Sequence, residues 1–367
     1  MRRMLSGILV FVCFITLHAA AAESPATPPK SFRPGELWPD TDGVHINAHG
    51  GGILIHDNTY YWFGEHKTEG RRGNNAWVGV GCYSSKDLYN WKNEGVALSV
   101  VKDDPSHDIT AGCIIERPKV IYNAKTGKFV MWFHLELRGK GYVAARAGVA
   151  VADKVTGPYQ YLYSLRPNAG VWPDNVTEQE KQPEKENFLA RDFEGGQMSR
   201  DMTLFVDDDG KAYHIYSAEE NYTLNISLLT DDYLKPAGKY VRVFPRGHME
   251  APTIFKHNGL YYFIGSECTG WNPNPAHSAV AKSIWGPWKE LGNPCQGERA
   301  DKTFESQSTY VLPLANKPGC FIFMADRWRP QNAIDGRYVW LPIEFEDNKP
   351  ILRWRDKWDL SFFDSKP

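Results

Sequence analysis

Short apolar segments recur along the chain in pairs, and a turn separates the two members of each pair. The first member has an apolar strand pattern, and the second is rich in Tyr, Trp and Phe. Two of the turns contain Asp209-Gly210 and Asn258-Gly259, and such pairs between two apolar runs are strong signals of a β-hairpin. The five predicted hairpins have strands at 52–55 and 60–64, 119–122 and 129–133, 203–206 and 213–216, 253–255 and 261–264, and 309–312 and 321–324.

Further strand patterns follow most of these hairpins, as at 81–85 with 88–91, 149–152 with 157–159, and 278–281 with 286–288. Four strands per unit and five units in series predict an all-β fold, a single five-bladed β-propeller with four antiparallel strands per blade. A β-sandwich is the alternative, but it would not explain five similar units in a row. No segment keeps a 3.6-residue period, so helices should be few. The longest insert between units, 168–197, is polar and charged.

The N-terminal 22 residues have the pattern of a secretory signal peptide. Arg2 and Arg3 precede an apolar run at 5–17, and four alanines at 19–22 offer a cleavage site. The run is shorter than a membrane-spanning helix requires, and no other run approaches that length, so we expect no membrane span. The chain is thus predicted to comprise a signal peptide (1–22), a Pro-containing linker (23–39) and a propeller domain (40–363), in a secreted or periplasmic protein.

Composition narrows the classes of partner. The 42 basic and 44 acidic residues give a net charge of −2, so the chain has no strong field for a nucleic-acid backbone. The 13 Trp, 18 Tyr and 18 Phe suit both the cores of β-strands and stacking on sugars. The six cysteines include no Cys-x-x-Cys pair, so neither a disulfide framework nor a zinc site is predicted. We expect a monomer that binds an oligo- or polysaccharide.

Polar residues directly precede the first strand of four of the five units. Because equivalent positions of a radial repeat converge on its axis, we expect these side chains to face one another at the mouth of the central channel. Carboxylates brought together in this way favour general acid–base chemistry, since burial and repulsion raise one pKa while another group stays ionised. Taken alone, each of these residues is more simply explained by a structural role, but their equivalent positions in the repeat favour a shared functional site. The four residues are Glu116, Asp201, Glu250 and Gln307.

Three motifs resemble glycoside hydrolase family 43, whose members are five-bladed β-propeller enzymes. The resemblance implies that Glu250 is the general acid, and that Asp201 tunes the pKa of this acid and orients it. The family's usual general base, an Asp in the first blade, has no counterpart, because residues 48–52 read Ala-His-Gly-Gly-Gly. The motifs are Glu116-Arg117-Pro118-Lys119-Val120, the run 200–210, and Glu250-Ala251-Pro252 followed by Tyr261-Tyr262.

Other motifs are similar to the branch of this family that contains exo-β-1,3-galactanases. In that branch a Gln of the fifth blade stands in for the base and a Glu of the second-blade motif is essential, which implies these roles for Gln307 and Glu116. A neutral amide is a poor proton acceptor, so the activation of water stays open between Gln307, Glu116 and Glu305. The motifs are Ala48-His49-Gly50, 61–65, Thr269-Gly270-Trp271-Asn272, Ser306-Gln307 and Asp326-Arg327-Trp328.

Candidate sugar contacts come from the same resemblance and from the aromatic residues. Glu65 and Arg117 match sugar-binding positions of the branch. Trp271 and Trp328 are candidate stacking platforms, with packing between blades as the alternative. Arg327 could bind hydroxyls or an acidic sugar, or simply pair with Asp326. The candidate substrate-binding residues are Glu65, Arg117, His49, Trp271, Arg327 and Trp328.

The expected activity is that of an inverting, exo-acting glycoside hydrolase on β-1,3-galactan, the backbone type of arabinogalactan. Other activities of the family, namely α-L-arabinofuranosidase, β-xylosidase and galactofuranosidase, are the nearest alternatives. The alternative from outside the enzymes is a carbohydrate-binding propeller without catalytic activity, which the missing Asp of the first blade suggests. This chemistry requires no cofactor, no metal site is predicted, and a structural calcium on the axis is left open.

Overall fold

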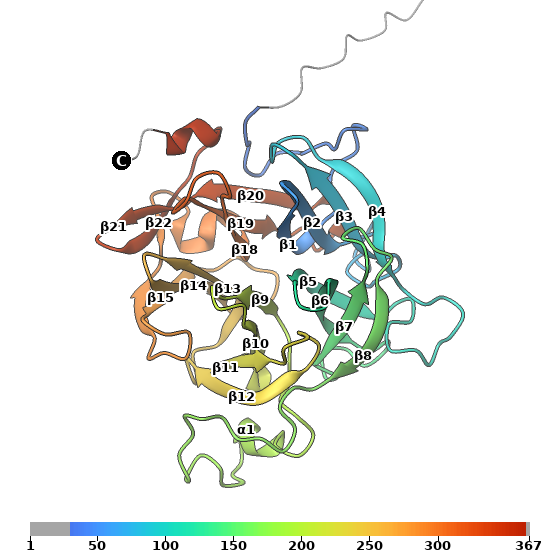
Figure 1. The fold of residues 1–367 in the computed structure, drawn as a ribbon, viewed down its shortest axis with the longest axis vertical. Helices are drawn as coiled ribbons and strands as arrows, with labels where there is room; N and C mark the ends of the chain where they lie inside the picture. Colours follow the sequence, from blue (N-terminus) through green and yellow to red (C-terminus); the bar gives the residue numbers. More distant parts are fainter. Residues whose placement is uncertain (1–29, 365–367) are drawn as a thin grey trace, which may run out of the picture.

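The computed structural model describes residues 30–364, and within this range the β-strands form six sheets around a central axis (Figure 1). The predicted signal peptide and residues 23–29 of the predicted linker lie outside the described residues. Among residues 30–364, no helix is long and apolar enough to cross a membrane. The helical segments are short: α1 (Phe188–Arg191) and 3-10 turns at Glu219–Asn221, Ala300–Glu305, Ala333–Asp335 and Leu360–Phe363.

Four of the sheets have four antiparallel strands in simple sequential order. Strands that are neighbours in the sequence pair with each other because short turns connect them, as the hairpin patterns predict. The sheets are β1 (His49–His56), β2 (Thr59–Glu65), β3 (Gly79–Ser85) and β4 (Lys92–Ser99); β5 (Ile114–Asn123), β6 (Lys128–Glu136), β7 (Arg146–Ala152) and β8 (Gln160–Leu165); β9 (Met202–Val206), β10 (Ala212–Ala218), β11 (Thr223–Leu229) and β12 (Pro236–Val243); and β13 (Met249–His257), β14 (Leu260–Glu267), β15 (Ala276–Ala281) and β16 (Lys289–Gly292).

The prediction of five blades with four strands each is wrong, because the described residues form six sheets and two of these have three strands. The fifth sheet consists of β18 (Gln307–Pro313), β19 (Phe321–Arg327) and β20 (Arg337–Pro342). The sixth consists of β17 (Cys295–Gln296), β22 (Lys349–Arg353) and β21 (Glu344–Glu346), and β17 pairs with β22 in parallel. The repeat pattern identified only the longer aromatic hairpins. β21 and β22 form a hairpin too short to match that pattern, and β17 pairs with β22 from a distant segment.

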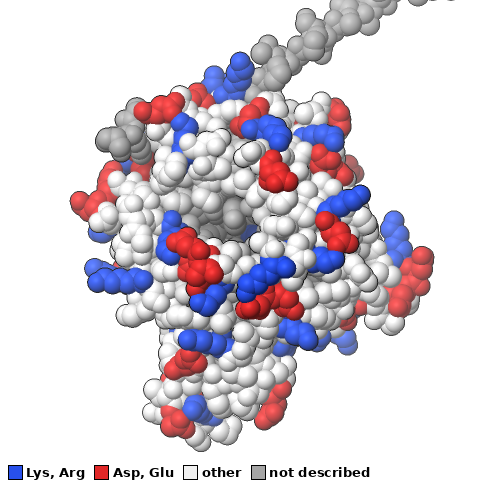
Figure 2. All heavy atoms as spheres, in the orientation of Figure 1, with Lys and Arg blue, Asp and Glu red and all other residues white. Residues whose placement is uncertain are grey.

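The first strands of five sheets surround the axis. β1, β5, β9, β13 and β18 contact one another in this order, and β18 closes on β1. Away from the strand starts, these strands line an apolar cavity of about 490 Å³ with residues such as Ile53, Val120, Leu204 and Phe255. The face seen in Figure 2 is hollowed at its centre, and the atoms that line the hollow are mostly uncharged. The polar residues at the strand starts therefore meet at a different level of the axis from these apolar residues.

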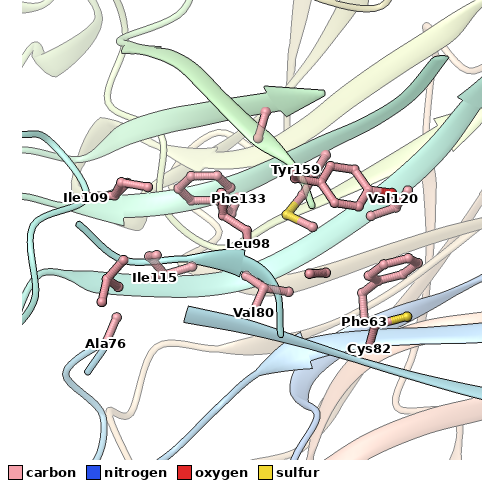
Figure 3. Packing of buried hydrophobic residues seen from close by; sticks show 14 of the residues in the cluster. Phe63, Ala76, Val80, Cys82, Leu98, Ile109, Ile115, Val120, Phe133 and Tyr159 are labelled. Carbon is pink, nitrogen blue, oxygen red and sulfur yellow. The ribbon is translucent and has the colours of Figure 1, made fainter. Parts of the chain in front are cut away.

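The cores lie between neighbouring sheets, and strand alternation assigns residues to them. Successive residues of a strand point to opposite faces, so Phe63 packs toward β5–β8 whereas Trp62 packs toward the fifth sheet. Figure 3 shows the first of these clusters, in which Phe63 lies with Val80, Leu98 and Phe133. Burial of each such side chain contributes about 1.5–3 kcal/mol, so the aromatic strands supply much of the stability of the propeller.

Residues near the start of the described chain complete the fold by packing on the fifth sheet. Phe32 is buried, its backbone N–H donates to the carbonyl of Trp358 at 2.7 Å, and the two rings lie 4.4 Å apart. Trp38 packs edge-on against Trp340 of β20, and the ring of Trp62 in β2 lies 4.9 Å from the same side chain. This aromatic cluster fastens the first and fifth sheets together and so stabilises the closed ring.

Candidate active site

β-Bulges occur at equivalent points of three inner strands. The pairing register slips after His49 in β1, after Glu116 in β5 and after Glu250 in β13. The residue that follows each of them has a left-handed backbone, with φ of 59° at Gly50, 56° at Arg117 and 52° at Ala251. Bulges re-aim side chains and are frequent beside active sites. The shared bulge explains how the starts of different strands present polar groups to one cavity.

A cavity of about 270 Å³ lies where these strand starts meet. All four residues predicted to converge there line it, which confirms that the equivalent positions share one site. Glu65, Arg117, Trp271 and Trp328 line it as well. The lining residues are Glu65, Lys67, Asn74, Glu116, Arg117, His134, Tyr142, Arg200, Asp201, Asn221, Glu250, Gly270, Trp271, Gln307 and Trp328.

Glu250 carries a carboxyl group whose pKa is raised toward neutrality. Burial, and then the negative charge of Asp201, raise the pKa of Glu250 to about 7. A carboxyl group with this pKa holds its proton through the mildly acidic range, in which an ordinary glutamate is ionised. The side-chain amide of Asn221 donates a hydrogen bond to Glu250 Oε1 at 2.7 Å and orients the carboxyl group.

Asp201 is anchored beside this acid. Its Oδ2 accepts the backbone N–H of Ala251 at 3.1 Å and lies 2.8 Å from Nη2 of Arg117. The first contact holds the carboxylate against the residue that follows Glu250, and the second keeps it paired with a cation. This arrangement agrees with a role for Asp201 in setting the pKa of Glu250.

Glu116 is held as an anion. Burial alone would raise the pKa of Glu116, but His134, Lys67 and the amide of Asn74 hold it well below its usual range. His134 Nδ1 lies 3.0 Å from Glu116 Oε2, and its Nε2 lies 2.9 Å from Glu136 Oε1. Burial would lower the pKa of His134, but these two carboxylates raise it to about 9. The site therefore keeps a fixed negative charge at Glu116.

Gln307 is held in one orientation by donors and an acceptor. Its Oε1 accepts from Nη2 of Arg117 at 2.5 Å and from the indole N–H of Trp328 at 2.9 Å. Its amide nitrogen donates to the hydroxyl of Ser266 at 2.9 Å. Because two obligate donors share the oxygen, the amide tautomer is the one that fits this network. Gln307 is thus a rigid polar group in the wall of the cavity.

Glu65 and Lys119 tie the bulges of β1 and β5 together. Glu65 Oε1 accepts the backbone N–H of Arg117 at 2.9 Å, and Lys67 pairs with the other oxygen. A Cβ on Gly50 would overlap the carboxylate of Glu65, so glycine is required at this left-handed position. Lys119 Nζ donates to the carbonyl of Gly50 at 2.9 Å. Burial lowers the pKa of Lys119 to about 7.

Three predicted site residues do not line the main cavity. His49 is fully buried and its ring stacks on Tyr338 at 5.1 Å. Arg327 donates to the carbonyl of Phe304 at 2.8 Å and lies 3.9 Å from Glu305. Glu305, with 43% of its side chain exposed, borders an adjoining small cavity beside Trp271 and Trp328. None of the three side chains is placed to touch a sugar in the main cavity.

Seven lining residues were missed by sequence reasoning, and the hairpin pattern alone would not have found His134. Glu116 pairs with His134 across β5 and β6, but the bulge after Glu116 shifts the register by one residue, so counting back from the turn would have paired Glu116 with Leu135 instead. The others come from loops or strand ends whose approach depends on the tertiary fold. The missed residues are Lys67, Asn74, His134, Tyr142, Arg200, Asn221 and Gly270.

Glu116, His134 and Asp201 offer ligand atoms that lie within 4.8 Å of one another, as a metal site would require. These atoms are already engaged, however. Both ring nitrogens of His134 face carboxylates, and Asp201 pairs with Arg117. The arrangement fits an ion-pair network better than a metal site.

A buried acid with a pKa near neutrality, in one cavity with the ionised carboxylate of Glu116 at the mouth of a β-propeller, defines a glycosidase type of site. The comparison with known families agrees with this class. Residues 51–308 match the family described as Glycosyl hydrolases family 43, and the chain belongs to this family. The protein is therefore a glycosidase, and the resemblance seen in its motifs is confirmed.

Solved structures of the family are similar over most of the chain. A GH43 β-1,3-galactosidase with galactodeoxynojirimycin is 55% identical, with a TM-score of 0.86, and the match covers 90% of this chain and 100% of that one. The exo-β-1,3-galactanase of Phanerochaete chrysosporium with β-1,3-galactotriose is 35% identical, with a TM-score of 0.75 and 90% and 68% covered. That of Clostridium thermocellum is 38% identical, with a TM-score of 0.75 and 89% and 66% covered.

Two curated relatives are more distant. The β-D-galactofuranosidase of Aspergillus niger is 28% identical over 116 residues, which are 31% of this chain. The xylan 1,3-β-xylosidase of a Vibrio species is 24% identical over 264 residues, or 68% of this chain. The matches span 33% and 40% of the lengths of these two proteins.

Proposed function

We propose that this glycosidase is inverting and exo-acting, and that it releases galactose from β-1,3-linked galactan. The observation that carries the catalytic part is Glu250, which lines the cavity and has a pKa of about 7. Below neutral pH it holds the proton that the leaving glycosidic oxygen needs. The similarity to β-1,3-galactosidases and exo-β-1,3-galactanases supports the substrate.

Gln307 and Glu116 serve the opposite side of the reacting sugar in this proposal. Gln307, fixed by Arg117 and Trp328, orients the attacking water. The permanent charge of Glu116 stabilises the oxocarbenium-like transition state, whose positive charge makes a weak base sufficient. The strongly lowered pKa of Glu116 argues against its being the principal proton acceptor. Glu305, outside the main cavity, is no longer a candidate for this role.

The remaining lining residues bind the sugar in this proposal. Trp271 is 44% exposed and packs edge-on against Trp328 at 5.8 Å, so its face is free to stack on a galactose ring. Arg117 lies over the ring of Trp328 at 5.3 Å and is itself held by Glu65. These residues form part of the wall of the cavity.

The test is hydrolysis of β-1,3-galactobiose followed by ¹H NMR. We expect galactose to appear first as the α-anomer, because inversion converts the β-linkage. Glu250→Gln should lower kcat by about 10²–10⁴-fold, the usual contribution of general acid catalysis. The exposed variant Asp208→Asn serves as a control with the same change of charge. Absence of galactose release, or hydrolysis that survives Glu250→Gln, would overturn the assignment, and β-galactose as first product would overturn inversion.

Other substrates of the family are outcomes of the same assay. Aryl α-L-arabinofuranosides, β-xylosides and β-galactofuranosides are tested in parallel, because the two curated relatives are named as a galactofuranosidase and a xylosidase. Preference for one of these would replace the galactan assignment while leaving the acid in place. Binding of galactan without turnover, unchanged in Glu250→Gln, would identify a carbohydrate-binding propeller.

We also propose export and a monomeric state. The charged and apolar pattern of residues 1–22 supports export to the periplasm or medium. Mass spectrometry of the expressed protein should find a mature N-terminus near residue 23, and light scattering should give the mass of one chain. An intact N-terminus inside the cell, or a dimer mass, would contradict these expectations.

A further inference from the structure

The turn after β10 has an unusual backbone. Glu219, Glu220 and Asn221 have φ of 52°, 57° and 67°, so three successive residues other than glycine occupy the left-handed region. Single residues with side chains enter this region at a cost, and a run of three persists only where the surroundings hold it. The turn therefore depends on its contacts.

Arg242 of β12 supplies the main contact. Its Nε and Nη2 bind the two carboxylate oxygens of Glu219 at 2.7 and 2.9 Å, and its Nη1 binds Glu180 of the insert at 2.7 Å. Only 10% of the Arg242 side chain and 7% of the Glu219 side chain are exposed. A bidentate pair that is largely shielded from water has a fixed geometry, unlike a surface ion pair.

The insert 168–197 reinforces this contact. The side-chain amide of Asn175 donates to the carbonyl of Arg242 at 2.7 Å and accepts its backbone N–H at 3.0 Å. Arg191, at the end of α1, binds Glu220 at 3.0 Å. The insert thus contacts both acidic residues of the turn, either directly or through Arg242.

The turn ends at the acid. Asn221, its third residue, donates from Nδ2 to Glu250 Oε1 at 2.7 Å. We propose that Arg242 is a positioning residue, which, together with Glu180 of the insert, holds the 219–221 turn so that Asn221 keeps Glu250 aimed at the leaving oxygen. The proposal deepens the proposed function, because it rests on Glu250 as the acid.

Other groups also act on Glu250, and two of them, Arg200 and Cys268, themselves contact the 219–221 turn. Because the hydrogen bond from Asn221 favours the ionised carboxyl group, loosening the turn should raise the pKa of Glu250 and move the alkaline limb of the rate profile upward. The charged and titratable groups around Glu250 from the packed elements are Asp201 and Arg200 before β9, Glu116 and Arg117 of β5, and Cys268 after β14.

The experiment compares Arg242→Gln and Glu180→Gln with the wild type. Lys239→Met is the matched control, because Lys239 also joins β12 to the insert, through Asp174 at 3.8 Å, but does not contact the turn. kcat and KM on β-1,3-galactobiose are measured across pH. In parallel, ¹³C NMR titration of labelled glutamate, with the Glu250 signal assigned by its loss in Glu250→Gln, follows the acid without substrate.

For Arg242→Gln we expect kcat to fall about tenfold, KM to change less than twofold, and the Glu250 midpoint to rise by about half a pH unit. Glu180→Gln should give a smaller change in the same direction and remain folded, and Lys239→Met should match the wild type. The proposal would be overturned if Arg242→Gln and Glu180→Gln both left kcat and the titration midpoint of Glu250 unchanged, or if Lys239→Met changed them equally. If the wild type releases no galactose, the proposed function fails, and the NMR titration of Glu250 alone then tests whether Arg242 positions Asn221.

Discussion

The charge of Asp201 offers the sharpest test of how the site sets the pKa of its acid. Asp201→Asn removes the negative charge but keeps the size of the side chain and an oxygen that can accept the N–H of Ala251. Burial and the Asp201 charge together place the pKa of Glu250 at about 7 rather than 4.5, a difference of about 3 kcal/mol. Burial is the larger cause and is unchanged by the substitution.

The expected loss is therefore a minority share of that difference, about one pH unit or roughly 1.4 kcal/mol. The sign follows from the charge: without Asp201 the carboxylate of Glu250 is easier to form, and its pKa falls. With a pKa near 6 instead of 7, the protonated fraction at pH 7 drops from about one half to about one tenth. At pH 5 the acid stays largely protonated in both proteins.

The assay is kcat/KM on β-1,3-galactobiose from pH 4 to 9. Asp201→Asn should move the alkaline limb down by about one unit, and the plateau should also fall because Arg117 loses its partner. Asp208→Asn, which removes the same charge from an exposed hairpin tip, should leave the limb in place. A limb that stays at the wild-type pH, or moves up, would refute the electrostatic role assigned to Asp201.

Gly50→Ala should lower kcat/KM by about a hundredfold and reduce the Tm, because Gly50 has a left-handed backbone and the added methyl group would displace Glu65. Gly43 also has a left-handed backbone but lies in open space, so Gly43→Ala should lower the free energy of unfolding by only about 1–2 kcal/mol, as measured by thermal melts. The pKa of His134 in the folded protein is about 9, above the ordinary histidine value of 6.5, so its charge contributes stability that is fully present below pH 6.5 and is lost as the pH rises through 9. The Tm of His134→Gln should therefore fall less steeply at alkaline pH than that of the wild type. Burial lowers the pKa of His214 to about 3, so its neutral ring contributes stability above pH 6.5 that falls by about 2 kcal/mol at pH 5; acid unfolding of His214→Phe that matches the wild type would contradict this.

The amino-acid pattern by itself determined the hairpins and the convergence of the site. Alternation of apolar and polar residues and Asn-Gly or Asp-Gly turns act over a few residues, so they specify hairpins without help from distant parts of the chain. Radial repetition then places Glu116, Asp201, Glu250 and Gln307 in one cavity, as the structure confirms. The family also followed from the motifs at these positions.

Only the tertiary structure decided the count of sheets and the partners of each site residue. β21 and β22 form a local hairpin, but the pairing of β17 with β22 joins segments far apart in the sequence, so no local pattern encodes the complete sixth sheet. The bulges send His49 into the core while Glu116 and Glu250 line the cavity, although all three precede equivalent slips of register. Burial and hydrogen bonding, which set the pKa of Glu250, depend on neighbours that only the closed ring brings together.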